Sequence, residues 1–302
     1  MSAATTPPAA GLRSSLPSLG ALTAKRDWIG GTAAVILVVV VLLAIFGPLI
    51  APHDTQQQDL LNRLTPPVWR ADGTWAYPFG TDQLGRDVLS RLIVGTRLTL
   101  LIAVAAAGVE LLIGATLGII AGFKGGRIQS VIMRWTDIQM SFPALLVVLL
   151  IILLLGSGPT TLILALGLNG WMVFTRVMNA EVRRLRYEPY VESAQLTGMS
   201  TFGLLRRHIL PQVRGRLLAV YLMEVPRMML AESGLSFLGF GINPPQLSWG
   251  LMIGESRSLI AVAPWPSLIP GLAIVITVMA MYLFASWLEP RVDPLRRRRV
   301  EA

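Results

Sequence analysis

Long stretches without any charged side chain limit what this chain can fold into. Residues 28–52 and 138–175 contain no Asp, Glu, Lys or Arg, and only 14% of the 302 residues are charged. A soluble domain usually carries about 25% charged residues. Because about 20 apolar residues are enough for a helix to cross the hydrocarbon core of a bilayer, the sequence predicts an all-α integral membrane protein.

The apolar segments predict six membrane-spanning helices. The sequence Gly156-Ser157-Gly158-Pro159 interrupts the longest segment with a turn signal, so we expect a hairpin of two helices there. The predicted spans are residues 29–51, 98–123, the two halves of 138–175, 217–240 and 266–288. Residues 98–288 then hold five of the six helices, together with a loop over 181–216.

The distribution of Lys and Arg predicts which ends face the cytoplasm. Most of the 26 basic residues lie before the first span, between the second and third, in the 181–216 loop and after the sixth. Since positive loops stay inside, both termini are placed in the cytoplasm. Residues 1–28 are predicted to be a disordered leader, and 289–302 a basic tail. We interpret the net charge of +9 as anchoring at the inner face, with no nucleic acid as partner.

The segment between the first two spans, residues 52–97, is predicted to lie outside the membrane. It mixes acidic and basic residues, which suits an amphipathic helix on the outer surface. Asp82 is expected to cap a helix that begins near Leu84 and continues into the second span.

Several kinds of chemistry are excluded by composition. The chain has no Cys and only two His, His53 and His208, which fall on opposite sides of the predicted membrane. A nucleotide-binding P-loop needs Gly immediately before its Lys, and neither Lys25 nor Lys124 follows a glycine. We therefore expect no catalytic residue, no metal site and no cofactor in this chain. Any active transport must draw on a partner or on an ion gradient.

The arginine-rich loop 181–216 is expected to form a compact knob. Residues 190–196 are predicted to be a short helix, Gly198 permits a sharp bend, and Thr201–Leu210 is predicted to be a second helix that Pro211 ends. Two short helices at an angle suit the cleft of another protein. The alternative is an amphipathic loop that rests on its own helix bundle.

Five motifs carry a resemblance to a known family. The sequence Glu192-Ser193-Ala194, with Gly198 and Ile209-Leu210-Pro211, resembles the EAA loop of ABC-importer permeases. Four further stretches resemble the dipeptide/oligopeptide permease family, in particular its C-type subunit: Phe79–Arg91; Gly95–Leu100; Leu235–Gly241 followed by Pro244-Pro245 and Ser248-Trp249-Gly250; and Pro264-Trp265 with Pro270-Gly271. Together they cover roughly residues 25–295. Two departures are Ser193, where the family has Ala, and Tyr282–Glu289, where it more often reads Asn-Leu-Leu-Gly-Asp.

The resemblance implies a bundle like that of type I ABC-importer permeases, forming half of a path for peptides or similar small solutes. It implies a second homologous permease subunit, two ATPase subunits that hold ATP and Mg, an external solute-binding protein and a bacterial cytoplasmic membrane. The implied ATPase-coupling residues are Tyr190, Glu192, Ser193, Ala194, Gly198, Ile209, Leu210 and Pro211, and a charge at Ala194 is expected to repel the ATPase. The implied external lid is Gly80, Thr81, Asp82, Gly85, Arg86 and Asp87. The alternative is a self-sufficient secondary transporter or channel.

Charged residues inside the predicted spans are candidates for the translocation path. Glu224 and Arg227 lie three residues apart and can pair on one helix face, and Glu232 holds the Glu position usual in the family. Glu110 stands alone in the second span. A charge at a helix centre costs about 2.5–3.5 kcal/mol and so faces the bundle interior or water. These residues either line a polar path or, in the structural alternative, pair between helices.

Overall fold

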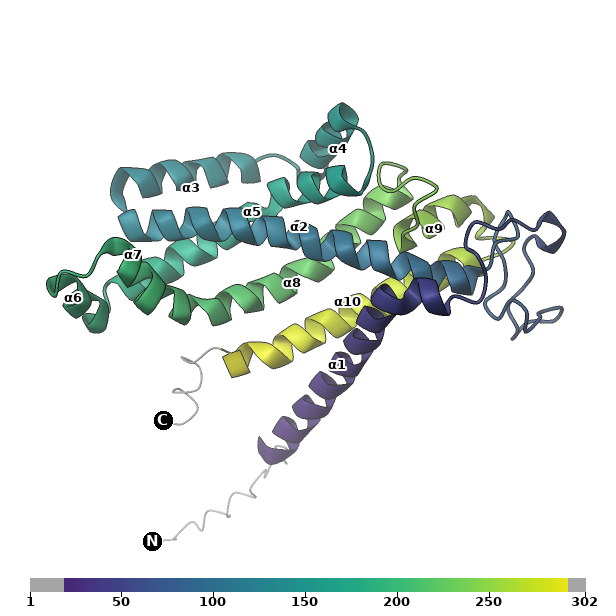
Figure 1. Ribbon diagram of the computed structural model, residues 1–302, viewed down its shortest axis with the longest axis horizontal. Coiled ribbons are helices and arrows are strands. Elements are labelled where there is room, and N and C mark those ends of the chain that lie inside the picture. Colours follow the sequence, from purple (N-terminus) through teal and green to yellow (C-terminus); the bar gives the residue numbers. More distant parts are fainter. Residues whose placement is uncertain (1–18, 293–302) are drawn as a thin grey trace, which may run out of the picture.

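The computed structural model describes residues 19–292, with the side chains of 27–291, and its regular secondary structure there is helical (Figure 1). The helices are α1 (Leu19–Ile50), α2 (Val88–Lys124), α3 (Gly126–Met140), α4 (Ala144–Leu155), α5 (Pro159–Arg186), α6 (Pro189–Leu196), α7 (Thr201–Leu204), α8 (Leu210–Phe237), α9 (Trp249–Ser256) and α10 (Trp265–Val292). Short turns of 3-10 helix lie at Leu60–Asn62 and Arg257–Leu259, and one turn of π-helix at Leu205–Ile209.

The centre of the bundle is the contact between α2 and α5, which run side by side in the same direction. Gly114, Gly118 and Gly122 form a stripe on α2 that lets the two backbones approach closely. A Cβ at these positions would lie 2.2–2.8 Å from a backbone oxygen of α5. Small residues at every fourth position commonly form such interfaces between membrane helices. Helix α8 packs against this pair in the opposite direction, and α1 packs with α10 (Figure 1).

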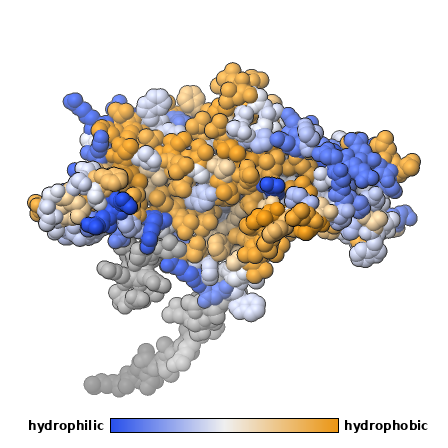
Figure 2. Space-filling view, in the orientation of Figure 1, coloured by the Kyte–Doolittle hydropathy of each residue, from blue (hydrophilic) through white to orange (hydrophobic). Residues whose placement is uncertain are grey.

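The surface is divided into an apolar middle and two more polar ends (Figure 2). Within the described residues, four helices are long and apolar enough to cross a membrane: Asp27–Ile50, Val88–Lys124, Pro159–Arg186 and Trp265–Arg291. Helices α3 and α4 provide a fifth only if counted as one span, although the pair is bent by 85°. The all-α class is therefore confirmed for the described residues, whereas the count of six is not reached, since α8 does not meet the same criterion.

The predicted hairpin within 138–175 has its turn in the expected place. Gly156 has a φ of +83°, and α5 begins at Pro159, a favoured first residue of a helix. The helix before the turn, α4, contains only 12 residues, which is too short to cross the core alone. The bend between α3 and α4 is the part that the sequence did not predict.

Pro211 does not end a helix, contrary to the prediction. It lies in the first turn of α8, where a missing N–H costs nothing, and helical structure continues from Thr201 to Phe237. The π-turn Leu205–Ile209 joins the two parts, with the amide of Leu210 donating to the oxygen of Leu205. A π-turn widens the hydrogen-bond spacing locally and here lets the chain pass the proline.

The helix expected to begin near Leu84 begins at Val88 and continues into the second span as predicted, but no separate surface helix precedes it. The segment is irregular apart from the turn Leu60–Asn62, and α2 begins only at Val88. Asp87, rather than Asp82, caps that helix by accepting hydrogen bonds from the amides of Leu89 (3.3 Å) and Ser90 (3.0 Å). The glycines and short turns before Val88 satisfy the backbone locally, so no helix is needed there.

The two ends of the chain differ from the predicted boundaries. Helix α1 begins at Leu19, so residues 19–28 of the expected leader are helical, and residues 1–18 lie outside the described range. Helix α10 extends into the expected tail as far as Val292, and residues 293–302, which include the run Arg296–Arg299, also lie outside it.

Candidate functional site

The helical knob, residues 188–211, folds on a small hydrophobic cluster that also contacts Phe123 of α2. Val191, Ala194 and Leu204 are buried against one another, and Met199 packs at the edge of the cluster. Gly198 turns the chain between α6 and α7 with a φ of +79°, a conformation that favours glycine. The predicted knob and its bend are therefore present in the structure.

The surface of the knob exposes apolar side chains beside charged ones. Leu196 is 85% exposed and Phe202 is 72% exposed, while Glu192 and Ser193 also face outward. A hollow of about 550 Å³ is lined by Met199, Phe202, Gly203, Arg206 and Arg207. Large apolar side chains in contact with a polar rim are typical of protein–protein contact surfaces.

Ala194 and Ile209 have a different role from the one expected of a contact surface. Ala194 is only 8% exposed and Ile209 is fully buried, where it packs with Met178 and Val182 of α5. A charge at Ala194 would therefore disrupt the packing of the knob itself, rather than repel a partner. Ile209 anchors the knob to the bundle.

The other predicted coupling residues lie at the knob surface. Tyr190 is 40% exposed, and partial burial, with the charge of Glu188 adding to it, raises the pKa of its phenol. Leu210 and Pro211 are exposed where the knob joins α8.

At the opposite end of the molecule, four charged side chains form a closed network, here called the charge ring. It consists of Asp82, Arg86, Arg91 and Glu255. Arg86 contacts Asp82 at 2.7 Å and Glu255 at 2.9 Å, and Arg91 contacts the same two carboxylates at 3.0 and 2.6 Å. Each arginine thus bridges two acids, and the ring ties the start of α2 to α9.

The residues predicted as an external lid are brought together as the buried centre of this end. Gly80 and Gly85 have positive φ values, and a Cβ on Gly85 would lie 1.8 Å from the oxygen of Asp59. Thr81 is fully buried, and its hydroxyl accepts a hydrogen bond from the amide of Thr65 at 2.9 Å. These contacts show that the segment Gly80–Asp87 is tightly packed at this end of the molecule.

A second charged cluster lies in the middle of the bundle, where α2, α5 and α8 meet. Arg227 pairs with Glu224, as predicted, and also reaches Glu110 at 3.3 Å. Glu110 is fully buried, and its second oxygen has no hydrogen-bond partner among the described residues. Gly170 leaves the space for it, since a Cβ there would overlap the carboxylate. The sequence does not predict this contact, because 117 residues separate the two partners.

Glu232 lies apart from that cluster in a bracket of serine hydroxyls. The side chain is fully buried, with Ser236 donating to it at 2.8 Å and Ser233 at 3.3 Å. Ser236 in turn accepts from the amide of Ile242 at 3.1 Å. The bracket fixes the turn that follows α8, and Glu232 therefore does not border an open path in this structure.

Comparison with known proteins places the chain in a family. Residues 114–294 match the family described as binding-protein-dependent transport system inner membrane component, and residues 25–67 match the N-terminal TM domain of oligopeptide transport permease C. The chain therefore belongs to the family of binding-protein-dependent transport system inner membrane components. This confirms the resemblance predicted from the five motifs.

Similar proteins cover almost the whole chain. The oligopeptide transport system permease protein OppC of Bacillus subtilis is 36% identical over 264 residues, which is 87% of this chain and 85% of that protein. The dipeptide transport system permease protein DppC of the same organism is 36% identical over 91% of this chain and 84% of its own length. The glutathione transport system permease protein GsiD of Pectobacterium atrosepticum is 30% identical, with coverages of 89% and 88%.

Proposed function

We propose that this chain is the membrane-spanning permease subunit of an ATP-driven ABC importer for peptides or similar small solutes. The observation that carries the proposal is the helical knob, which presents Leu196 and Phe202 on a preorganised scaffold. The family match and the printed functions of the similar proteins agree with this role. Because the sequence contains no P-loop, ATP and Mg belong to separate ATPase subunits that receive the knob.

The proposed topology has six spans with both termini in the cytoplasm. Four helices meet the apolar criterion on their own, the bent pair α3–α4 supplies a fifth, and α8, with 28 residues, is long enough to be the sixth. Its acidic side chains Glu224 and Glu232 are buried in the bundle, and its half-exposed Arg227 pairs with Glu224 and Glu110. The excess of Arg in the segments on either side of the knob supports the cytoplasmic location of the knob.

The translocation path is proposed to run beside Arg227. Its side chain is 46% exposed although it lies within a helix that packs in the bundle. A charge exposed to hydrocarbon is costly, so this face of α8 borders water or a second permease subunit rather than lipid. The same argument makes this chain half of a path that a homologous subunit completes.

The proposed partners are a second permease subunit, two ATPase subunits and an external solute-binding protein, in a bacterial cytoplasmic membrane. The test is purification of the tagged full chain from its native membrane, followed by reconstitution into liposomes. An importer subunit brings ATPases and a second permease with it and takes up peptide only with ATP and the binding protein. Uptake by the purified chain alone would instead support a secondary transporter or channel.

A further inference from the structure

The side chain of Arg227 carries hydrogen-bond donors that this chain does not use. Its Nε donates to Glu224, and its Nη2 donates to Glu110 at 3.3 Å. A guanidinium has more N–H donors than these two contacts occupy, and Nη1 has no partner among the described residues. Because the side chain is 46% exposed, the unused donors belong to a group that reaches the surface of the bundle.

Glu224 adds an unused acceptor beside these donors. Its Oε2 accepts from Arg227, and the described residues give its Oε1 no partner. The free oxygen of Glu110 is enclosed, whereas the side chain of Glu224 is 10% exposed. Residues three apart are neighbours on a helix, so α8 presents a donor and an acceptor next to each other.

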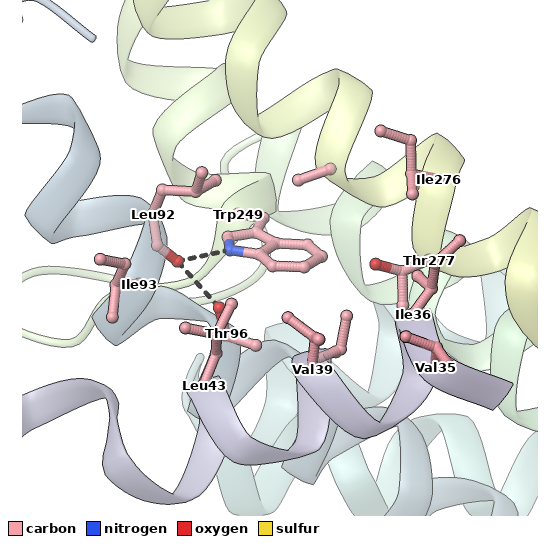
Figure 3. A pocket seen from close by; sticks show the side chains of 12 residues that line it. Val35, Ile36, Val39, Leu43, Leu92, Ile93, Thr96, Trp249, Ile276 and Thr277 are labelled. Atoms are coloured by element: carbon pink, nitrogen blue, oxygen red, sulfur yellow. Dashed lines mark hydrogen bonds between the residues drawn. The ribbon is translucent and has the colours of Figure 1, made fainter. Parts of the chain in front are cut away.

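Polar groups in the apolar pocket between α1, α2, α9 and α10 are satisfied differently. There the ring nitrogen of Trp249 donates to the oxygen of Leu92 at 2.8 Å, and the hydroxyl of Thr96 donates to the same oxygen at 2.9 Å (Figure 3). Polar groups without partners are costly within a membrane. Arg227 and Glu224 therefore need a partner from outside the chain, whereas the pocket does not.

Glu110 and Gly170 hold the Arg227 side chain in place. Glu110 contacts it from α2, and Gly170 of α5 lies so close that an added Cβ would be 2.8 Å from Nη2. A long side chain that is already held loses less conformational entropy when it binds a further group. Glu110 is therefore suited to position Arg227, while Arg227 and Glu224 keep free atoms for a ligand.

The paired charges select the kind of group that the site can take. The guanidinium is shared between two acids, which makes it a weak partner for a solute carboxylate, although it can still donate to a neutral carbonyl. Glu224 can likewise accept from a neutral N–H. In a β-ladder, one residue of an extended peptide exchanges both its N–H and its C=O with the same neighbour, which matches one acceptor beside one donor.

We propose that Arg227 and Glu224 bind the backbone amides of the peptide as it crosses the membrane, and that Glu110 is a positioning residue. This inference rests on the proposed function as an importer of peptides. It adds that the path recognises the peptide backbone, which is common to all peptides, rather than a charged end or a particular side chain.

The test changes one atom of the solute and one side chain in turn. The assembled transporter, with its ATPases, second permease and binding protein, is reconstituted into liposomes. The probes are trialanine and alanyl-alanyl-lactate, in which an ester oxygen replaces one peptide N–H. Maximal ATP-dependent uptake rates are measured with saturating binding protein, and because the same binding protein is used throughout, its own preference cancels between transporter variants.

In Glu224→Met, the ratio of the trialanine rate to the ester rate should fall about fivefold, the effect of one hydrogen bond of about 1 kcal/mol. Glu289→Met is the matched control, since it removes another acid that pairs with an arginine of α8, at 3.0 Å from Arg216, and it should keep the wild-type ratio. A wild-type ratio in Glu224→Met would overturn this inference and leave the importer function standing. Absence of ATP-dependent trialanine uptake by the wild-type transporter would overturn both.

A second measurement applies if Glu224→Met does not assemble. The chain contains no cysteine, so Leu230→Cys places its only thiol three residues from Arg227, at a position that is 47% exposed. We expect this thiol to react with a water-soluble reagent and to lose reactivity when trialanine is being transported. Val38→Cys, at a position 57% exposed on α1, is the control and should show no protection. A Leu230→Cys thiol that trialanine does not protect, or that the second permease subunit covers completely, would overturn the proposal.

Discussion

The charge ring and the helical knob lie at opposite ends of the molecule and satisfy their side chains in opposite ways. In the ring, two arginines and two carboxylates are paired entirely within the chain. In the knob, three buried apolar residues support a surface that leaves Leu196 and Phe202 exposed. The ring satisfies its own charges, although Leu61 and Trp75 are exposed at the same end of the molecule, whereas the knob places its exposed apolar side chains directly on its folded scaffold.

The difference shows that a distinctive sequence motif can either maintain the fold or form a contact surface. The stretch containing Gly80 to Asp87 is distinctive because its backbone must turn tightly and its charges must pair when buried. The stretch containing Glu192 to Pro211 is distinctive because part of it holds the knob together and part faces outward. Residues of the first kind are expected to affect stability, and outward residues of the second kind to affect coupling with little effect on stability.

The largest effect on stability is expected from Asp82→Ala. It leaves Arg86 and Arg91, 7% and 3% exposed, with one shared carboxylate, and breaking a buried ion pair costs about 3–5 kcal/mol. The measurement is the thermal unfolding of the purified transporter. Asp54→Ala, at an exposed position, is the control and should change little. An Asp82→Ala protein as stable as the control would mean that the ring does not hold this end.

A smaller and more local effect is expected from Leu204→Ala. Leu204 is 1% exposed in the knob cluster, and such a truncation costs about 2–5 kcal/mol. Hydrogen exchange should speed up in residues 189–204 and stay unchanged around the charge ring. Phe202→Ala, which removes an exposed side chain, is the matched control and should leave the exchange rates unaltered. Uniform loss of protection at both ends would show that the two regions do not fold independently.

Gly198→Ala should destabilise the knob by about 1–2 kcal/mol, the cost of placing a β-carbon in a left-handed conformation. Space is not the reason, since no atom lies within 4 Å of the added carbon. Gly108→Ala is the control, because Gly108 is equally free of neighbours but lies in α2 without a positive φ. Hydrogen exchange of α6 and α7 compares the two. Equal effects would argue against strain at the bend.

Leu196→Asp is expected to change stability least, by less than about 0.5 kcal/mol for an exposed site, yet to abolish ATP-dependent uptake. The physical reason is a charge placed on the apolar area that the ATPase covers. Ala180→Asp, exposed on α5, controls for added negative charge nearby and should transport normally. Normal uptake by the Leu196→Asp transporter would remove Leu196 from the contact.

Local chemistry explains what the sequence could predict. The charge-free segments predicted apolar helices. The cluster at Gly156–Pro159 predicted a turn, and Gly198 predicted the bend of the knob. The same local signals do not predict features that depend on contacts between residues far apart in the sequence. The chain stays helical through Pro211 because a π-turn precedes it and the proline lies in the first turn of α8. The pairing of Glu110 with Arg227 depends on α2 and α8 meeting in space. Ala194 was predicted to be a contact residue because the spacing of the EAA-like motif does not show which side of helix α6 faces inward.

The proposed coupling role of the knob requires direct contact between the knob and an ATPase subunit. The chain contains no cysteine, so Ser193→Cys, at an exposed position, gives this chain a single thiol within the assembled transporter. With a short bifunctional thiol–amine reagent, we expect a cross-link between this chain and an ATPase subunit, reduced when ATP changes the conformation of the complex. Thr65→Cys, at the opposite end, should give none. Absence of an ATPase cross-link from position 193 in a complex that still hydrolyses ATP and imports peptide would contradict the account.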